Sequence, residues 1–264
     1  MDKVQKNLES EGRLNLEQYV SVSLVDVVTE KIRSNIYSGK YLPGQRLVVR
    51  EISEELGVSH TPVKDALNRL VSEGYVVALP RKSMVVREYS NIEFIDNYDQ
   101  RLMIELYYAE EIIKRGKADR SIISDMEKYY GEMEDFLHKD GELAGLTWVN
   151  CETKLHRRYM EGCSNQRIYD LYCKLDTNKS SYMMYLNNNK LPLSLEFLKK
   201  NNEEHKALIE AIKSGDARQF GQVVAAHLVR SCAVYAIDQI STRRFQQMKE
   251  NAERFIGSLD EQKS

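Results

Sequence analysis

Apolar positions recur at helical spacing through the first part of the chain and then give way to β-branched runs. The spacing predicts a helix of about fifteen residues from Leu24, a short helix within VVREISEELGV and a third within PVKDALNRLVSEG. Gly57 marks the turn before the third helix, and Ser59 has a side chain that suits a helix N-cap. Two β-branched runs around a polar tip, YVVALPRKSMVVREY, predict a β-hairpin. This order of elements is that of a winged helix-turn-helix.

Beyond Ser90 the pattern predicts long amphipathic helices and no strand. Amphipathic helices of this length bury their apolar stripes against one another, so an all-α antiparallel bundle is expected. The chain is therefore expected to be mainly α, with a flexible arm at 1–20, a winged helix-turn-helix at 21–88 and a bundle at 91–258. The predicted helices of the bundle cover 91–116, 120–139, 142–161, 165–188, 194–213, 216–241 and 242–257.

Composition narrows the class of protein. The 264 residues are 42% hydrophobic and 30% charged, which is typical of a globular chain. No apolar run approaches the roughly 20 residues of a membrane span, and the opening MDKVQKNLES lacks the apolar core of a signal peptide. We therefore expect a cytoplasmic protein without a membrane partner. The four cysteines share no CxxC spacing and are expected to be reduced. The net charge of −2 does not by itself predict nucleic-acid binding.

Basic and polar side chains gather around the predicted recognition helix that begins at Ser59. Residues near the N-terminus of such a helix can meet phosphates and base edges. Nearby arginines can neutralise phosphates, and cations at a hairpin tip can touch the flanking minor groove. Considered alone, each would also suit a solvated surface charge. The candidate DNA contacts are Arg46, Arg50, Ser59, His60, Thr61, Lys64, Arg69, Arg81 and Lys82.

Three of the five histidines fall on three different predicted helices of the bundle. They are His156, His205 and His227, and Glu152 lies four residues before His156 on the same helical face. Three imidazole nitrogens and one carboxylate suit Zn²⁺, Ni²⁺, Mn²⁺ or Fe²⁺, with positions left for water or a ligand. The alternative is that each histidine is an ordinary polar residue, bonded to a backbone carbonyl or to solvent. The spacing leaves both interpretations open.

The N-terminal motifs resemble the DNA-binding domain of the GntR family of bacterial transcription regulators. Residues 32–47 carry the I-x(3)-I-x-x-G opening and the P-G-x-x-L that follows it. The stretch EISEELGVSHTPVKDALNRLVSEG carries the E-x(4)-L-G-V-S-x-T-P-V core. The family usually has arginine where this chain has His60 and Lys64, and neither replacement makes the bidentate guanine contact of an arginine. The resemblance therefore implies operator binding with a sequence preference that differs from that of other family members. A second departure is in the predicted hairpin, or wing, where Ser83 stands at a position at which the family commonly has glycine.

The C-terminal half resembles the ligand-binding FCD domain of the FadR-like branch of this family. The similar stretches are ETKLHRRYMEGCSNQRIYDLY, EEHKALIEAIKSGDARQF and AAHLVRS. Members that bind metal use an Asp-x(3)-His pair and two further histidines. The resemblance assigns these roles to Glu152, His156, His205 and His227, with glutamate one methylene longer than the usual aspartate.

Arg101 and Glu105 stand in the R-x(3)-E pattern of the same domain. The resemblance implies that Arg101 pairs with a carboxylate effector, and a guanidinium fork near a metal can grip a carboxylic acid at two points. The alternative for Arg101 is a salt bridge with Glu105 on the helix surface.

The expected function is that of a ligand-responsive transcription regulator and not of an enzyme. A homodimer would bind an operator of two half-sites, and a divalent metal with a small carboxylate effector would modulate that binding. One alternative is a metal-dependent hydrolase, but no HExxH motif supplies a general base beside the metal. Another is a regulator that senses the metal without an organic effector.

Overall fold

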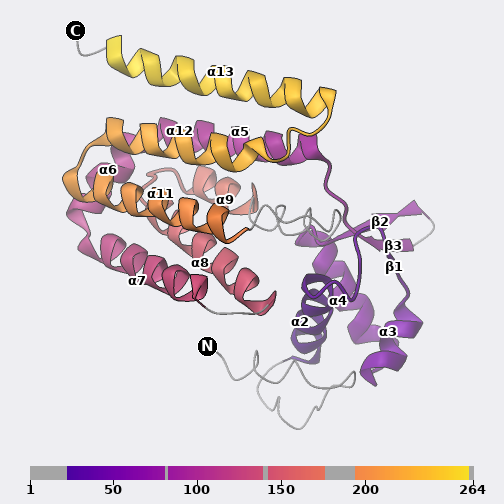
Figure 1. Cartoon of the computed structure of the whole chain (residues 1–264). Coiled ribbons are helices and arrows are strands. Elements are labelled where there is room, and N and C mark those ends of the chain that lie inside the picture. Colours follow the sequence, from indigo (N-terminus) through magenta and orange to yellow (C-terminus); the bar gives the residue numbers. More distant parts are fainter. Residues whose placement is uncertain (1–22, 81–82, 139–141, 176–193, 262–264) are drawn as a thin grey trace. The chain divides into compact units, whose positions relative to one another are not determined.

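The computed structural model of the chain describes residues 23–80, 83–138, 142–175 and 194–261 (Figure 1). The chain divides into two compact units, one that ends at Glu88 and one that begins at Tyr89. Helices dominate both units, and the strands among the described residues all lie in the first. The prediction of a mainly α protein, with a winged helix-turn-helix before a helical bundle, is confirmed. The predicted arm at 1–20 lies outside the described residues.

The first unit packs its helices around a small apolar core. Its elements are α2 (Leu24–Tyr37), β1 (Arg46–Leu47), α3 (Val49–Leu56), α4 (His60–Ser72), β2 (Val76–Leu79) and β3 (Ser83–Val86). Gly57 follows α3 at φ 70°, a left-handed conformation that glycine adopts without steric cost. This glycine therefore turns the chain sharply from α3 toward α4. Each helix turns apolar side chains such as Ile32, Leu56 and Leu67 into the core.

The sheet of the first unit has one more strand than the predicted hairpin. β2 and β3 pair antiparallel, with Val76 opposite Val86, as the hairpin requires. β1 adds to the other edge of β3, with Arg46 opposite Val85, so the strand order is β1-β3-β2. A two-residue strand is too short to show an alternating pattern, so β1 could not be predicted from the sequence.

The second unit is built from α5 (Asn91–Tyr107), α6 (Ala109–Ala118), α7 (Arg120–Leu137), α8 (Glu142–Met160), α9 (Gln166–Leu175), α11 (Leu195–Ser214), α12 (Ala217–Ala233) and α13 (Gln239–Glu261). The helix predicted over 91–116 is two helices, which separate at Tyr108 without a glycine or proline to mark the break. The helix predicted over 216–241 ends at Ala233. The Asp238 carboxylate then accepts hydrogen bonds from the backbone at the start of α13. The part of the predicted helix 165–188 beyond Leu175 lies outside the described residues.

The interior of the second unit forms where its helices pack against one another. α11 lies against both α7 and α12, α7 also packs on α8, and α12 packs on α5. Aromatic side chains fill the core between them, including Trp148, Tyr159 and Phe220. Gly116 lets α6 approach α11 closely, because a Cβ at this position would collide with the side chain of Ile212.

Candidate metal centre and DNA-reading face

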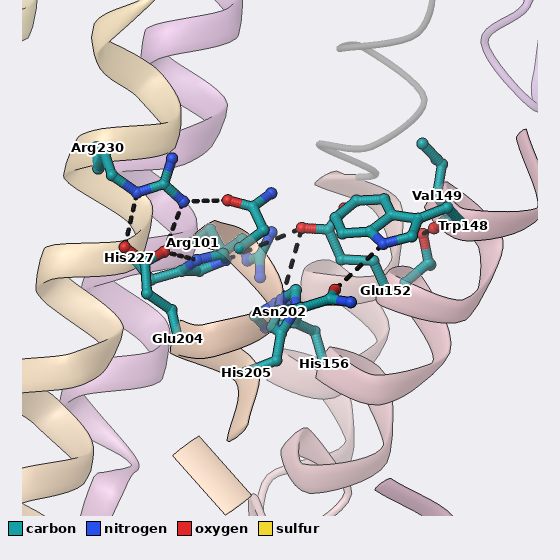
Figure 2. Close-up of polar contacts among 12 residues, drawn as sticks. Arg101, Trp148, Val149, Glu152, His156, Asn202, Glu204, His205, His227 and Arg230 are labelled. Carbon is teal, nitrogen blue, oxygen red and sulfur yellow. Dashed lines mark hydrogen bonds and ion pairs between the residues drawn. The ribbon is translucent and has the colours of Figure 1, made fainter. Parts of the chain in front are cut away.

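Three helices of the second unit bring four potential metal ligands to one buried point (Figure 2). Glu152 and His156 lie one turn apart on α8, His205 lies on α11 and His227 on α12. Their ligand atoms all lie within 4.8 Å of one another, and all four side chains are buried. The structure thus brings together the four residues that the sequence analysis singled out.

The spacing of the donor atoms fits one cation. His156 Nε2 lies 3.1 Å from His205 Nε2. Glu152 Oε1 lies 3.7 Å from His205 Nε2 and 3.9 Å from His227 Nε2. Two neighbouring ligands bound about 2.1 Å from one ion lie about 3.0–3.4 Å apart, so the His156–His205 pair already has this spacing, and the wider separations, up to 4.8 Å, would have to shorten around an ion. Three imidazole nitrogens and a carboxylate form a donor set for a divalent transition metal. The group could therefore hold such an ion.

Burial keeps the three imidazoles neutral. It lowers the pKa of His156, His205 and His227 below the ordinary value, and the positive charge of Arg101 acts in the same direction on all three. At His227 the hydrogen bond and the negative charge of Glu204 raise the pKa, but burial prevails. Burial also raises the pKa of Glu152 to about 7, although Arg101 acts in the opposite direction. Neutral imidazoles offer free lone pairs, which is the form that binds a metal.

His227 is hydrogen-bonded to an acidic side chain through its second ring nitrogen, Nδ1. Its Nδ1 donates to Glu204 Oε2 at 2.8 Å, and Arg230 donates to both carboxylate oxygens of Glu204 (Figure 2). Burial raises the pKa of Glu204, but the hydrogen bonds from Arg230 and His227 prevail and lower it to about 2. Glu204 and Arg230 are not among the site residues predicted from the sequence. Arg230 lies three residues after His227, a helical spacing that could have revealed it.

Arg101 and Glu105 form a buried ion pair in the same region. Arg101 Nε donates to Glu105 Oε1 at 2.6 Å, and the two side chains are 4% and 0% exposed. The salt bridge named in the alternative is present, but its expected position on the helix surface is wrong, because α5 turns this face toward the bundle interior. The Glu105 carboxylate also accepts hydrogen bonds from the hydroxyls of Tyr159 and Tyr172.

The N-terminus of α4 presents several of the candidate DNA contacts to solvent. Ser59 is the N-cap residue, but its hydroxyl makes no capping hydrogen bond to the described backbone. His60, Thr61 and Lys64 follow on the first two turns, and all are exposed. The amide groups and side chains of this turn are therefore open to a polyanion.

The remaining candidate DNA contacts differ in the ion pairs that they form within the protein. Arg46 in β1 and Arg50 in α3 are exposed, and within the described part of the chain Arg50 forms a loose ion pair with Glu54 at 3.5 Å. Arg69 lies near the far end of α4 and forms ion pairs with Asp26 and Glu73. Arg81 and Lys82 lie outside the described residues.

Each of the two units matches a known protein family. The family described as "Bacterial regulatory proteins, gntR family" matches residues 24–86, and the family described as "FCD domain" matches residues 96–230, more than half of the chain. No helix of the described residues is long and apolar enough to cross a membrane.

Individual relatives are distant but extend over most of the chain. The gluconate operon transcriptional repressor of Bacillus licheniformis is 24% identical over 79% of this chain and 84% of its own. The uncharacterized regulator YdhC of Bacillus subtilis is 21% identical over 76% of this chain and 86% of its own. The solved structure of E. coli McbR/YncC has a TM-score of 0.63 at 19% identity and covers 81% of this chain and 97% of that protein. The chain therefore belongs to the GntR family of bacterial regulatory proteins and is a DNA-binding transcription regulator with an FCD domain.

Proposed function

We propose that this regulator binds its operator as a homodimer, and that a divalent metal and a small carboxylic acid in the FCD domain modulate that binding. The observation that carries the proposal is the buried convergence of four potential ligands beside a buried arginine. The metal would be held by Glu152, His156, His205 and His227. When bound, it would supply a Lewis-acidic partner for the carboxylate of the acid, and Arg101 would supply a second, hydrogen-bonding partner.

The exposed N-terminal turn of α4 supports the DNA half of the proposal. His60, Thr61 and Lys64 would approach the major groove, where phosphates position a recognition helix and base edges specify the sequence. Arg46 and Arg50 would neutralise neighbouring phosphates. A homodimer supplies the two copies of this helix that an operator of two half-sites requires.

The chemistry of the candidate site favours acids with a carboxylate that can meet both a cation and a guanidinium. Sugar acids, hydroxy acids, short dicarboxylates and amino acids all satisfy this requirement. Because one relative is named for the gluconate operon, gluconate is the first probe. We propose binding rather than catalysis at this centre, since the relatives are named as transcription regulators.

The experiment combines an acid screen with a measurement of operator affinity. Metal-loaded protein is screened by thermal shift against gluconate, lactate, citrate and amino acids, and each stabilising acid is added to a DNA-binding titration. We expect at least one acid to stabilise the protein and to change operator affinity about 5–150-fold. Arg101→Lys keeps the charge but loses the planar fork, so it should remove the response. An unchanged response in Arg101→Lys would exclude Arg101 from acid binding.

A second candidate is a metal sensor without an organic effector. It is favoured by one observation, which is that Glu105 already supplies a carboxylate to Arg101. The two candidates differ in a metal titration without acid. A sensor changes operator affinity with metal alone, whereas the leading proposal requires the acid as well.

A further inference from the structure

Tyr159 lies between a potential metal ligand and the ion pair of α5. Its hydroxyl donates to Glu105 Oε2 and is in hydrogen-bond contact with Nδ1 of His156, one turn earlier on α8. His156 Nδ1 itself lies 4.0 Å from the same carboxylate oxygen. The Tyr159 hydroxyl therefore connects His156 to Glu105 through two hydrogen bonds. Tyr159 and His156 are both buried.

The hydrogen-bonding capacity of each group fixes the direction of this chain. An ionised carboxylate only accepts hydrogen bonds, and a tyrosine hydroxyl has one proton to donate. Because Tyr159 gives its proton to Glu105, its oxygen must accept from His156, and Nδ1 of His156 must carry the ring proton. Nε2 is then the unprotonated nitrogen. It is also the nitrogen that faces His205 Nε2 at 3.1 Å, within the group of potential ligands.

We propose that Glu105 and Tyr159 are positioning residues that hold His156 in the tautomer and orientation required of a metal ligand. The inference rests on the proposed metal site and adds a role for two residues that would not touch the ion. Outer contacts of this kind commonly change metal affinity 10–100-fold. They also give the ion pair of Arg101 a physical connection to the metal site, because Arg101 and Tyr159 share one carboxylate.

Tyr172 provides a matched control within the same hydrogen-bonded group. Its hydroxyl donates to Glu105 Oε1 at 2.7 Å, and the side chain is buried like that of Tyr159. Tyr159→Phe and Tyr172→Phe therefore remove the same chemical group from the same carboxylate. Only Tyr159→Phe also removes the partner of His156. Any difference in metal affinity between the two variants reports on the histidine rather than on Glu105 or on general packing.

Glu105→Gln tests the direction of the chain without changing the size of the side chain. Arg101 and Tyr172 both donate to the Oε1 position, so the carbonyl oxygen of the glutamine belongs there. Its amide NH₂ would then face Tyr159 and donate to it. The Tyr159 hydroxyl would turn its proton toward Nδ1 of His156, which would move the ring proton to Nε2 and block that nitrogen for a metal.

The experiment measures Zn²⁺ and Co²⁺ affinity of the full chain by competition with a chelator. We expect Tyr159→Phe and Glu105→Gln to bind about 10–100-fold more weakly than the unsubstituted protein, and Tyr172→Phe to bind within about threefold of it. Long-range ¹H–¹⁵N correlation of the metal-free protein should show the Nδ1–H form of His156 in the unsubstituted protein and in Tyr172→Phe. The proton should shift toward Nε2 in Glu105→Gln.

Other results would overturn either the positioning role or the proposed function. Equal affinity in all variants, or equal losses in Tyr159→Phe and Tyr172→Phe, would overturn the positioning role while leaving the metal site intact. Absence of metal binding by the unsubstituted protein would instead overturn the proposed function. If Tyr159→Phe fails to fold, the histidine tautomer in Glu105→Gln still decides the question.

Discussion

Nε2 of His156 lies 3.1 Å from Nε2 of His205, although the two residues are 49 positions apart and lie on different helices. Two neutral imidazole nitrogens at this distance either share one proton or face a common cation. Glu152 lies 3.7 Å from the same nitrogen of His205, which adds a carboxylate to the pair. This relationship makes metal binding the first property to test.

Removing His205 should remove the metal. We expect His205→Ala to carry far less than one equivalent of metal by elemental analysis, because the buried donor at the centre of the group is lost. In the unsubstituted protein, metal at 100 times its Kd should stabilise the fold by about 2.7 kcal/mol, and the variant should lose this gain in thermal unfolding. His138→Ala is the control, since His138 is exposed at the end of α7. Full metal content in His205→Ala would exclude His205 as a ligand.

The metal-free protein should lose stability as the pH falls below neutrality. Burial lowers the pKa of His156, His205 and His227, so on acidification the unfolded chain takes up protons on these histidines that the native protein binds less readily, least so at His227, where Glu204 opposes the shift. Glu152 has its pKa raised to about 7 and acts in the opposite direction, because the native protein holds its proton between about 4.5 and 7. The strongly shifted His156 and His205 alone outweigh Glu152, so acidification causes a net loss of stability. Each proton is worth roughly 1.4 kcal/mol per pH unit at most.

Denaturant unfolding of the metal-free protein at about pH 7 and about pH 5.5 measures this slope. His205→Gln removes one of the three titrating groups and should make the slope shallower. A free energy of unfolding that rises on acidification would contradict the expected sign.

Lys64→Ala and Arg50→Ala should weaken operator binding and reduce its salt dependence. Each phosphate contact contributes about 0.9 to the slope of log K against log salt, so each variant should lower the slope by about that amount. Arg69, another candidate contact on the same helix as Lys64, is paired with Asp26 and Glu73, so Arg69→Ala should lower the slope less than Lys64→Ala. An unchanged slope in both Lys64→Ala and Arg50→Ala would show that neither side chain contacts the DNA backbone.

Two helical glycines should respond oppositely to alanine. Gly116→Ala places a methyl group against Ile212, which is fully buried, so overpacking should cost about 1–3 kcal/mol. Gly131 in α7 has open space around the added Cβ, and alanine there should gain up to about 1 kcal/mol from helix propensity. Denaturant unfolding of both variants checks the contrast. A neutral Gly116→Ala would show that α6 and α11 can move apart without cost.

Local sequence determined most of the fold and the identities of the candidate ligands. Gly57, with its positive φ, and the two β-branched runs are local signals, so the helix-turn-helix and the β2–β3 hairpin could be predicted from neighbouring residues. The break at Tyr108 and the strand β1 could not, because neither has a glycine, a proline or a repeating pattern of its own. The four candidate ligands were found through their residue types and their resemblance to a known domain.

Only the tertiary structure decided which side chains surround those ligands. Glu204 meets His227 across two helices, and Tyr159 joins His156 to a carboxylate 54 positions away from the tyrosine. Burial likewise turned an ordinary i,i+4 pair, Arg101 and Glu105, into a desolvated one. Helical periodicity tells which face a residue occupies but not which face of another helix it meets. That information lies in the packing of α5, α8, α11 and α12, which depends on all of their side chains together.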